Sequence, residues 1–369
     1  MINTHGYSMD LTVAGGVRKY LASRISLDVE SVEKLSGGYC NFAWRAKLKT
    51  PYQGQKSVVV KHAAPFASAN REIQMAVERQ AYEYKSLKTV TSEASLFKNK
   101  LVSVPSVYHY DPDMHVMVMQ DAGTLPTLLN LLCATPPLSA GMAAEIGSQV
   151  AKFIAGLHNW GRSSVQGRAL LSSADAFGRT AMDTHGYQNV VRNAAASGIT
   201  DLLLPTVMAA LAEQDRTCDE TAVMGDFWSA NMLVDIAESA TGEQTLKKIW
   251  IIDWENSRYG SPVVDVSSFV GDCYLISRFY DQPSAEALRH SFLATYAGLA
   301  QVDPRQVAIS VGTFWIMWTK ARGWGSEEEL RECIEKGVEY IHAGWDGSRE
   351  GRTLSLTREL VSDNVRARI

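Results

Sequence analysis

A change in hydrophobic pattern near residue 120 constrains the fold of this chain more than any other feature. Before it, short apolar runs separated by turn residues predict strands at 29–35, 41–48, 57–62, 104–110 and 115–120. Two stretches have helical spacing instead, a weakly amphipathic one at 10–25 and a long charged one at 71–90. After Gly123 the pattern is mainly helical. We therefore expect an α+β fold, with a small β-rich N-terminal lobe containing one long helix and a large helical C-terminal lobe.

The length of 369 residues agrees with two lobes, because it is about twice that of a typical domain. We place the boundary between residues 120 and 121, within a hinge at 119–123. Predicted helices of the second lobe occupy residues 125–132, 140–160, 307–321 and 326–342, and short apolar strands occupy 223–224 and 249–252. A ligand is expected in the cleft between two such lobes.

Composition excludes several classes of protein. Lys and Arg number 36 against 40 Asp and Glu, which argues against a basic nucleic-acid binder. No apolar run approaches the roughly 18 residues of a membrane helix, and the polar start lacks a secretory signal pattern. The five cysteines are scattered and predict no disulfide framework or zinc ribbon. The chain is expected to be a soluble, cytoplasmic protein without membrane or nucleic-acid partners.

The most informative motif is Gly225-Asp226 with Asn231 five positions after the Asp, flanked by apolar strand-like residues. In phosphoryl transfer, an Asp in such a loop orients and deprotonates the attacking hydroxyl, while the Asn binds a magnesium ion. The alternative is a simple turn capped by Asp226. A second motif, Ile252-Asp253, ends an apolar strand and suits delivery of a carboxylate to a metal, although alone it could be a helix N-cap or a turn. The two motifs together favour phosphoryl transfer.

Two features of the first lobe complete this set. Lys61 ends a run of three valines, where a cation is costly unless it is paired. Glu83 in the following predicted helix is the preferred partner and Glu78 the reserve, although Lys61 could also reach solvent from the strand end. Gly37 and Gly38 lie between two strands, where their backbone N–H groups either approach phosphate oxygens or form an ordinary hairpin turn.

These motifs resemble the aminoglycoside phosphotransferase and choline kinase superfamily, whose members have a protein-kinase-like fold. The resemblance covers nearly the whole chain and includes Leu157-His158 and the later Gly260-Ser261-Pro262 with Asp265. One departure is Met224, where most of the superfamily has His. That His is largely a packing and hydrogen-bonding element, so its loss does not argue against activity.

Longer shared strings resemble a narrower fungal branch that contains the 4-hydroxytryptamine kinases of psilocybin biosynthesis, relatives of methylthioribose kinases. The strings occupy residues 35–39, 51–54, 61–63, 271–279 and 324–329. The resemblance implies transfer of the γ-phosphate of ATP, with Mg²⁺, to a hydroxyl of a small molecule, with 4-hydroxytryptamine as the leading acceptor. Methylthioribose or an amino sugar is the nearest alternative, and a pseudokinase that binds without turnover is an alternative of a different class.

The resemblance also implies residue roles. Residues 1–120 form the nucleotide-binding lobe and 121–369 the catalytic, acceptor-binding lobe. The implied ATP-binding residues, by side chain or backbone, are Lys61, Glu83, Gly37, Gly38, Met119, Gln120 and Asp121. Asp226 is implied as the catalytic base, Asn231 and Asp253 as magnesium ligands, and Asp265 as a brace for the catalytic loop.

Four acceptor-site candidates rest on closeness in the sequence or on residue type. Trp228 and Trp254 lie within two positions of the proposed catalytic residues and could form a wall for an aromatic acceptor. An amine on that acceptor would favour a carboxylate, for which Glu255 and Asp272 are candidates. The partner is therefore expected to be a small hydroxylated aromatic amine, and the sequence does not fix an oligomeric state.

Overall fold

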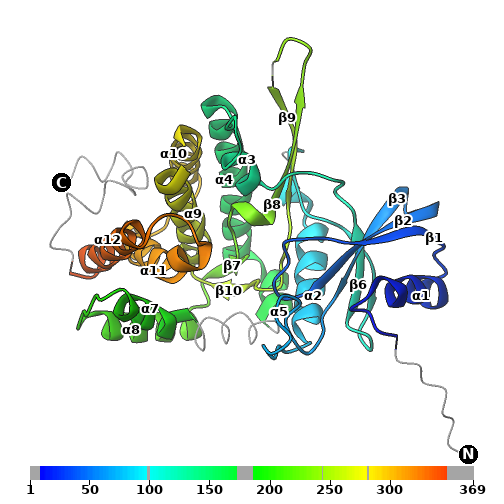
Figure 1. The fold of residues 1–369 in the computed structure, drawn as a ribbon, viewed down its shortest axis with the longest axis horizontal. Helices are drawn as coiled ribbons and strands as arrows, with labels where there is room; N and C mark the ends of the chain where they lie inside the picture. The colour runs from blue at the N-terminus through cyan, green and yellow to red at the C-terminus, as the bar shows by residue number, and fades with distance from the viewer. Residues whose placement is uncertain (1–8, 98–99, 173–185, 243, 281, 347–369) are drawn as a thin grey trace, which may run out of the picture. The chain divides into compact units, whose positions relative to one another are not determined.

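The computed structural model describes residues 9–97, 100–172, 186–242, 244–280 and 282–346 (Figure 1). Their contacts divide the chain into two compact units. The first unit comprises Met1–Ser92 and Val104–Thr124, and the second comprises Glu93–Ser103 and Leu125–Ile369. The functions that sequence analysis gives to residues 1–120 and 121–369 remain predictions.

The first unit is built on a five-stranded antiparallel sheet of order β1-β2-β3-β6-β5. Its strands and helices are, in chain order, α1 (Ala14–Ile25), β1 (Val29–Lys34), β2 (Phe42–Tyr52), β3 (Gln55–His62), α2 (Arg79–Ser92), β5 (Val107–Asp111) and β6 (Val116–Gln120). The expected strands are thus confirmed. Helix α1 packs against β1 and β2, and α2 packs against β5 and β6.

Local chemistry explains the β2–β3 hairpin. Every second residue of β2 from Phe42 to Leu48 is buried, as a strand with one face on a core requires. Gln53 and Gly54 both have positive φ, of 49° and 76°. This backbone geometry matches the two-residue turns that join tightly paired antiparallel strands.

The helix expected at 71–90 is shorter than predicted, because α2 begins only at Arg79. The preceding residues make other hydrogen bonds. The side chain of Asn70 accepts from the backbone N–H of Glu72, and Met75 N–H donates to Pro65 O. A backbone committed to these bonds cannot also form helical ones.

The second unit is mainly helical and contains two small sheets, of orders β4-β9-β8 and β10-β7. Its helices include α3 (Leu128–Leu132), α4 (Ala140–Ser163), α5 (Val165–Ser172), α7 (Tyr187–Ala196), α8 (Leu204–Thr217), α9 (Val263–Tyr280), α10 (Pro283–Ala297), α11 (Pro304–Arg322) and α12 (Glu327–Asp346). Its strands are β4 (Val102–Ser103), β7 (Thr221–Val223), β8 (Met232–Glu238), β9 (Gln244–Ile251) and β10 (Arg258–Gly260), and its short 3₁₀ helices include η1 (Ala94–Phe97) and η3 (Ser229–Asn231).

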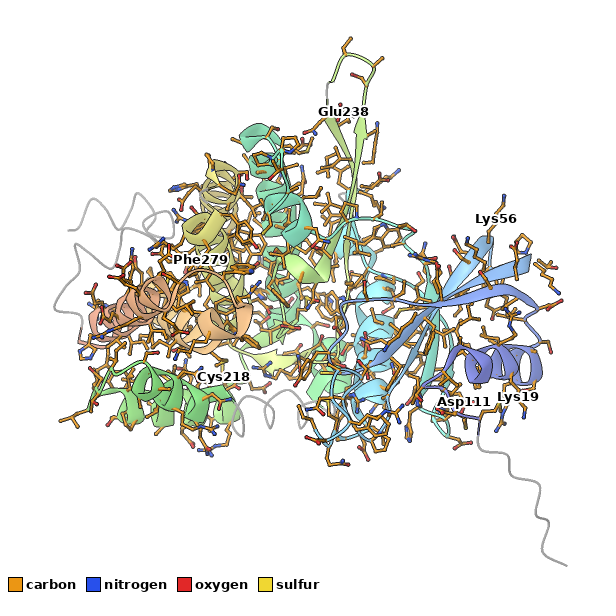
Figure 2. The ribbon with its side chains drawn as sticks, viewed as in Figure 1. Lys19, Lys56, Asp111, Cys218, Glu238 and Phe279 are labelled. Carbon is orange, nitrogen blue, oxygen red and sulfur yellow. The ribbon has the colours of Figure 1, made fainter. Side chains whose placement is uncertain are left out.

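Helix packing forms the framework of this unit. Helix α4 packs against α10, and α11 packs against both α9 and α12. Glycines allow a close crossing of α11 and α12, since a Cβ at Gly312 of α11 would lie 2.3 Å from the carbonyl oxygen of Gly337 on α12. The β8–β9 hairpin extends beyond these helices, with Glu238 near its tip (Figure 2).

Two further expectations can be compared with the structure. The five cysteines all lie within the described residues, and no disulfide bond joins them there. Within the described residues, no helix combines the length and the apolar character needed to cross a membrane.

Candidate functional site

The Lys61–Glu83 pair is present in the first unit. Lys61 lies on β3 and Glu83 on α2, and the Lys61 Nζ atom is 2.8 Å and 2.7 Å from the two carboxylate oxygens of Glu83. Both residues are buried, Lys61 with 9% and Glu83 with 1% of its surface exposed. The predicted pairing is thus confirmed, and Glu78 is not needed as the reserve partner. A buried pair of this kind fixes the direction of the lysine ammonium.

The glycine pair lies in the loop between β1 and β2. Gly37 has a φ of 97°, and a Cβ there would meet no atom within 4 Å, so open space lies beside the backbone. The hydroxyl of Ser68 donates to Gly38 O at 3.0 Å and ties this loop to the segment after β3. Phosphate covering by Gly37 and Gly38 stays a prediction.

Arg79 is a structural residue that sequence analysis overlooked. Its guanidinium is fully buried and donates to Asn41 Oδ1 at 2.8 Å, Ala64 O at 2.8 Å and Ala76 O at 2.6 Å. It therefore joins the end of the glycine loop to the start of α2. An arginine in a charged stretch gives no sequence signal that distinguishes it from a solvated one.

Residues 119–121 end the first sheet. The backbones of Met119 and Gln120 pair with β3, and Gln120 N–H donates to Ser106 O at 2.8 Å. Arg45 donates to both carboxylate oxygens of Asp121, at 2.7 Å and 3.0 Å. Burial alone would raise the pKa of Asp121, but the hydrogen bonds from Arg45 and Ser57 hold it below its usual value. The Asp121 carboxylate is thus fully engaged, and adenine binding by this backbone stays a prediction.

The second unit contains the loop that follows β7. Gly225 has a φ of 81°, and a Cβ there would lie 2.3 Å from Asn256 O, so a side chain at this position is excluded by both conformation and space. Asp226 follows, and its Oδ2 accepts a hydrogen bond from Asn231 Nδ2 at 2.8 Å. The same amide donates to Asp226 O at 3.0 Å. The predicted Asp and Asn are therefore brought together.

Asp253 lies directly after β9 and belongs to the same arrangement. Ile252 N–H donates to Asn231 O at 3.0 Å and joins the two motifs. Asp253 has a φ of 66°, a left-handed conformation that is strained for a residue with a side chain and is common at functional sites. Burial, together with repulsion from the nearby Asp253 carboxylate, raises the pKa of Asp226 to about 7.

The donor set suits a magnesium ion. Asp226 and Asp253 repel each other, and a cation would relieve that repulsion. The amide N–H₂ group of Asn231 donates to Asp226, so the amide oxygen of Asn231 is the atom that could face a cation. Carboxylate and amide oxygens are ligands that Mg²⁺ accepts. The residues present therefore fit the ion, although its binding stays a prediction.

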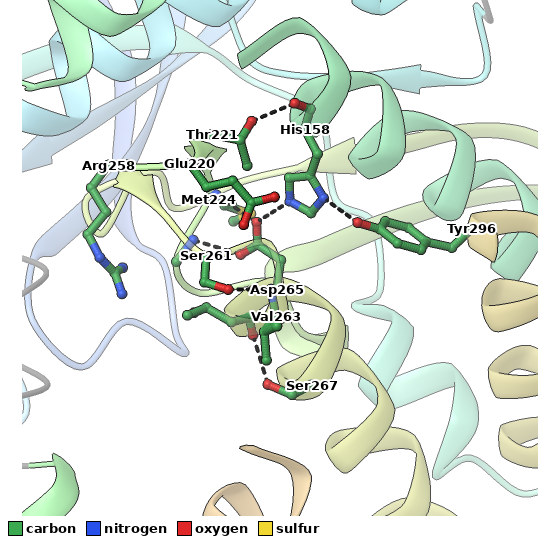
Figure 3. Close-up of polar contacts among 12 residues, drawn as sticks. His158, Glu220, Thr221, Met224, Arg258, Ser261, Val263, Asp265, Ser267 and Tyr296 are labelled. Carbon is green, nitrogen blue, oxygen red and sulfur yellow. Dashed lines mark hydrogen bonds and ion pairs between the residues drawn. The ribbon is translucent and has the colours of Figure 1, made fainter. Parts of the chain in front are cut away.

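Asp265, on α9, holds the start of this loop (Figure 3). Its buried carboxylate accepts from Met224 N–H at 2.9 Å and from Gly225 N–H at 2.8 Å. His158 Nε2 lies 3.1 Å from the same carboxylate, and Nδ1 lies 2.8 Å from the hydroxyl of Tyr296. Because a carboxylate only accepts, Nε2 carries the proton here, and in the neutral ring Nδ1 accepts from Tyr296. The expected bracing by Asp265 is confirmed.

Asp272, also on α9, holds the later part of the loop. Its Oδ2 accepts from Ser229 N–H at 3.0 Å, and its Oδ1 accepts from the guanidinium of Arg322. Asp272 is fully buried, so both of its oxygens are used within the protein. This argues against Asp272 as the carboxylate that receives an amine. Arg322 has no role among the predictions from the sequence, because two of its partners, Asp272 and Trp228, come from distant segments.

The remaining acceptor-site candidates have different surroundings. Trp254 is buried, donates from Nε1 to Ile251 O at 3.0 Å and packs edge-on against Phe153, which favours a role in the core. Trp228 is only partly buried and lies under the Arg322 guanidinium, 4.6 Å from its ring centre. Glu255 follows Trp254 in the sequence and is buried.

The chain is similar to known proteins in sequence and in backbone structure. The ecdysteroid kinase-like family matches residues 167–276, which include the loop at Asp226, Asp253 and Asp265. A choline/ethanolamine kinase family protein from Mesorhizobium loti superposes with a TM-score of 0.46 and 18% identity, covering 93% of this chain and 98% of that one.

Two curated relatives are much more similar in sequence. The 4-hydroxytryptamine kinase of Psilocybe cyanescens is 39% identical over 356 residues, covering 95% of this chain and 98% of the relative. The 4-hydroxytryptamine kinase of Psilocybe cubensis is 37% identical over 360 residues, covering 95% of this chain and 99% of the relative. Identity of this size along both whole chains shows that the protein belongs to the 4-hydroxytryptamine kinase family of phosphotransferases.

Proposed function

We propose that the protein transfers the γ-phosphate of ATP to the phenolic hydroxyl of 4-hydroxytryptamine or a close relative of it. The observation that carries this proposal is the hydrogen-bonded pair of Asp226 and Asn231 beside Asp253, in a chain 39% identical to a 4-hydroxytryptamine kinase. A phosphoryl-transfer site needs a base for the attacking hydroxyl and oxygen ligands for magnesium. These three residues supply both.

In the proposed mechanism, Asp226 accepts the proton of the acceptor hydroxyl while the oxygen attacks the γ-phosphorus and the bond to ADP breaks. Asn231 fixes the orientation of this carboxylate through its 2.8 Å hydrogen bond. Asn231 and Asp253 would hold Mg²⁺, which when bound neutralises charge on the phosphates. Lys61, oriented by Glu83, would contact the ATP phosphates, with Gly37 and Gly38 covering them and the 119–121 backbone meeting the adenine.

A phenol suits a carboxylate base. Its pKa is about 10, as for a Tyr side chain, whereas an alkyl alcohol is a much weaker acid. Less of the barrier then depends on the strength of the base. Of the two carboxylates considered for the acceptor's amine, Glu255 remains the candidate, because Asp272 already serves Arg322 and Ser229.

The direct test is release of ADP from ATP and Mg²⁺ with separate acceptors: 4-hydroxytryptamine, its N-methylated forms, methylthioribose, choline and kanamycin. We expect turnover on the hydroxytryptamines. In the Asp226→Asn variant we expect turnover to fall by at least a thousandfold while ATP affinity, measured by calorimetry, stays within about threefold. Asp219→Asn, at an exposed carboxylate of the same unit, is the matched control and should behave as wild type.

Each other outcome has a defined meaning. Turnover on methylthioribose or kanamycin alone would keep the kinase and reject the indole acceptor. ATP binding without turnover on any acceptor of the panel would reject the proposed activity and favour a pseudokinase. Wild-type turnover by Asp226→Asn would reject Asp226 as the base.

A further inference from the structure

The indole N–H of Trp228 is a buried donor that lacks an acceptor among the described residues. An unmade hydrogen bond on a buried polar group costs about 1–3 kcal/mol. Such a group in a folded protein therefore needs an explanation. Trp254, the other tryptophan near the site, shows the usual arrangement, because its N–H donates to Ile251 O.

The unpaired N–H lies next to the proposed base. Trp228 follows Asp226 by two residues, and it lowers the pKa of the Asp226 carboxylate even though the contact falls short of a hydrogen bond. Asn231 already occupies Oδ2 of that carboxylate. Hydrogen bonds of catalytic groups are often long in a ligand-free site and shorten when substrates bind.

The indole ring of Trp228 is held from outside the loop. The Arg322 guanidinium lies over the Trp228 ring, 4.6 Å from its centre. Arg322 is fixed in turn by its ion pair with the buried Asp272, which also accepts the N–H of Ser229. Two contacts thus converge on adjacent residues of the loop: a stacking contact on Trp228 and a hydrogen bond on Ser229.

Arg322 also contacts a second indole. The centre of the Trp324 ring lies 4.9 Å from the Arg322 guanidinium carbon. The same ring packs edge-on against Tyr280 of α9. Trp324 stands between Gly323 and Gly325, which have φ values of 66° and 76°. A Cβ at Gly325 would come within 2.5 Å of Phe279, so this backbone path is specific to glycine. Arg322 is therefore in contact with two indoles and a carboxylate.

We propose that Trp228 and Arg322 are positioning residues for the base, with the Trp228 N–H holding the Asp226 carboxylate and Arg322 holding the indole. This inference rests on the proposed role of Asp226 in phosphoryl transfer. Asn231 and Trp228 would then direct the carboxylate together, so that its lone pair meets the acceptor hydroxyl. No covalent bond to Trp228 or Arg322 forms or breaks in the reaction.

The contact itself can be tested without any turnover. In ¹H–¹⁵N spectra of the full chain with a non-hydrolysable ATP analogue and Mg²⁺, the indole signal of Trp228 is the one lost in Trp228→Phe. We expect that signal to shift by more than about 0.3 ppm in ¹H when Asp226 is replaced with Asn, because a charged acceptor is removed. The indole signal of Trp324, assigned through Trp324→Phe, is the matched control and should stay in place. An unmoved Trp228 signal would overturn the proposal.

Kinetics test the positioning role. Trp228→Phe keeps an aromatic ring near Arg322 but removes the N–H together with one of the two fused rings. The kcat should fall about ten- to hundredfold, the loss expected for one hydrogen bond to a charged group. Arg322→Lys keeps a cation for Asp272 but loses the flat guanidinium, and kcat should fall about tenfold. In both variants the Kd of the acceptor should stay within twofold. Arg278→Lys, at an arginine over Phe279 with exposed glutamate partners, is the control and should retain wild-type kcat.

The outcomes separate this inference from the proposed function. A weaker acceptor Kd with unchanged kcat in Trp228→Phe would show that Trp228 contacts the acceptor and would overturn the positioning role. Wild-type kinetics in that variant would do the same. If the wild-type protein phosphorylates no acceptor, the proposed function fails, and the ¹H–¹⁵N spectra still decide whether Trp228 holds Asp226. Thermal unfolding of each variant identifies losses that come from misfolding.

Discussion

Replacing Asp265 with Asn tests whether this buried carboxylate holds the proposed catalytic loop in its working conformation. The change keeps the shape of the side chain, so it leaves no cavity. Asp265 accepts from three donors: the N–H groups of Met224 and Gly225 and the ring of His158. An Asn has one acceptor oxygen and one N–H₂ group, so at least one of these donors must face another donor.

The magnitude follows from that count. Hydrogen bonds to charged groups contribute about 1.5–3 kcal/mol each. If the amide N–H₂ group faces Gly225, only that bond is lost, and the free energy of unfolding should fall by about 2 kcal/mol. If it faces Met224 and His158, two bonds are lost, and the fall should be about twice as large. Either rotation displaces the backbone directly before Asp226. We expect kcat to fall by at least about tenfold while ATP affinity is retained.

Urea unfolding and steady-state ADP release on the same preparations measure both effects. Asp303→Asn is the matched control, since Asp303 caps α11 by accepting from Arg305 N–H at 2.9 Å and Asn caps helices equally well. The control should lie within about 0.5 kcal/mol of wild type. An Asp265→Asn variant with unchanged unfolding free energy and unchanged kcat would refute the bracing argument.

Three further predictions concern the charged groups. Glu83→Gln should raise the KM for ATP about tenfold, because Lys61 loses the carboxylate that orients it, and a wild-type KM would remove Glu83 from the nucleotide site. Asp253→Ala should raise the Mg²⁺ concentration for half-maximal turnover at least tenfold, and an unchanged magnesium titration would contradict its role as a ligand. Without metal, the pKa of Asp226 is about 7 against 3.8 for a free Asp, so the folded state binds this proton more tightly. The contribution of Asp226 to the unfolding free energy should therefore fall as pH rises through that interval. In metal-free urea unfolding at several pH values, Asp226→Asn should abolish this part of the pH dependence. An identical pH dependence in the variant would refute the pKa shift.

Much of the fold could be predicted because local patterns determine it. The strand at β2 buries alternate residues, and the helices of the second unit follow apolar spacings of three and four. The start of α2 was placed too early because residues 71–78 have the composition of a helix. Their backbone bonds to residues near Pro65 depend on tertiary structure, which local spacing does not encode.

The candidate site divides in the same way. The pairs Lys61–Glu83 and Asp226–Asn231 join residues that recur in known motifs, and the structure brings both pairs together. The role of Arg322 was missed. Two of its partners, Asp272 and Trp228, are 50 and 94 positions away, and the third, Trp324, follows it in a loop. An arginine in a sequence does not reveal which distant ring or carboxylate it will meet.

Helix α9 sets a fixed interval for the loop that it braces. Asp265 and Asp272 are seven positions apart, about two helical turns, so both carboxylates point to the same side and reach opposite ends of one loop. Inserting or deleting one residue between them would rotate one carboxylate by about 100° and release its end of the loop. Homologues that retain this loop should therefore keep the number of residues between the two aspartates constant. Length variation should instead collect in places such as the β8–β9 connection, where no such register is kept.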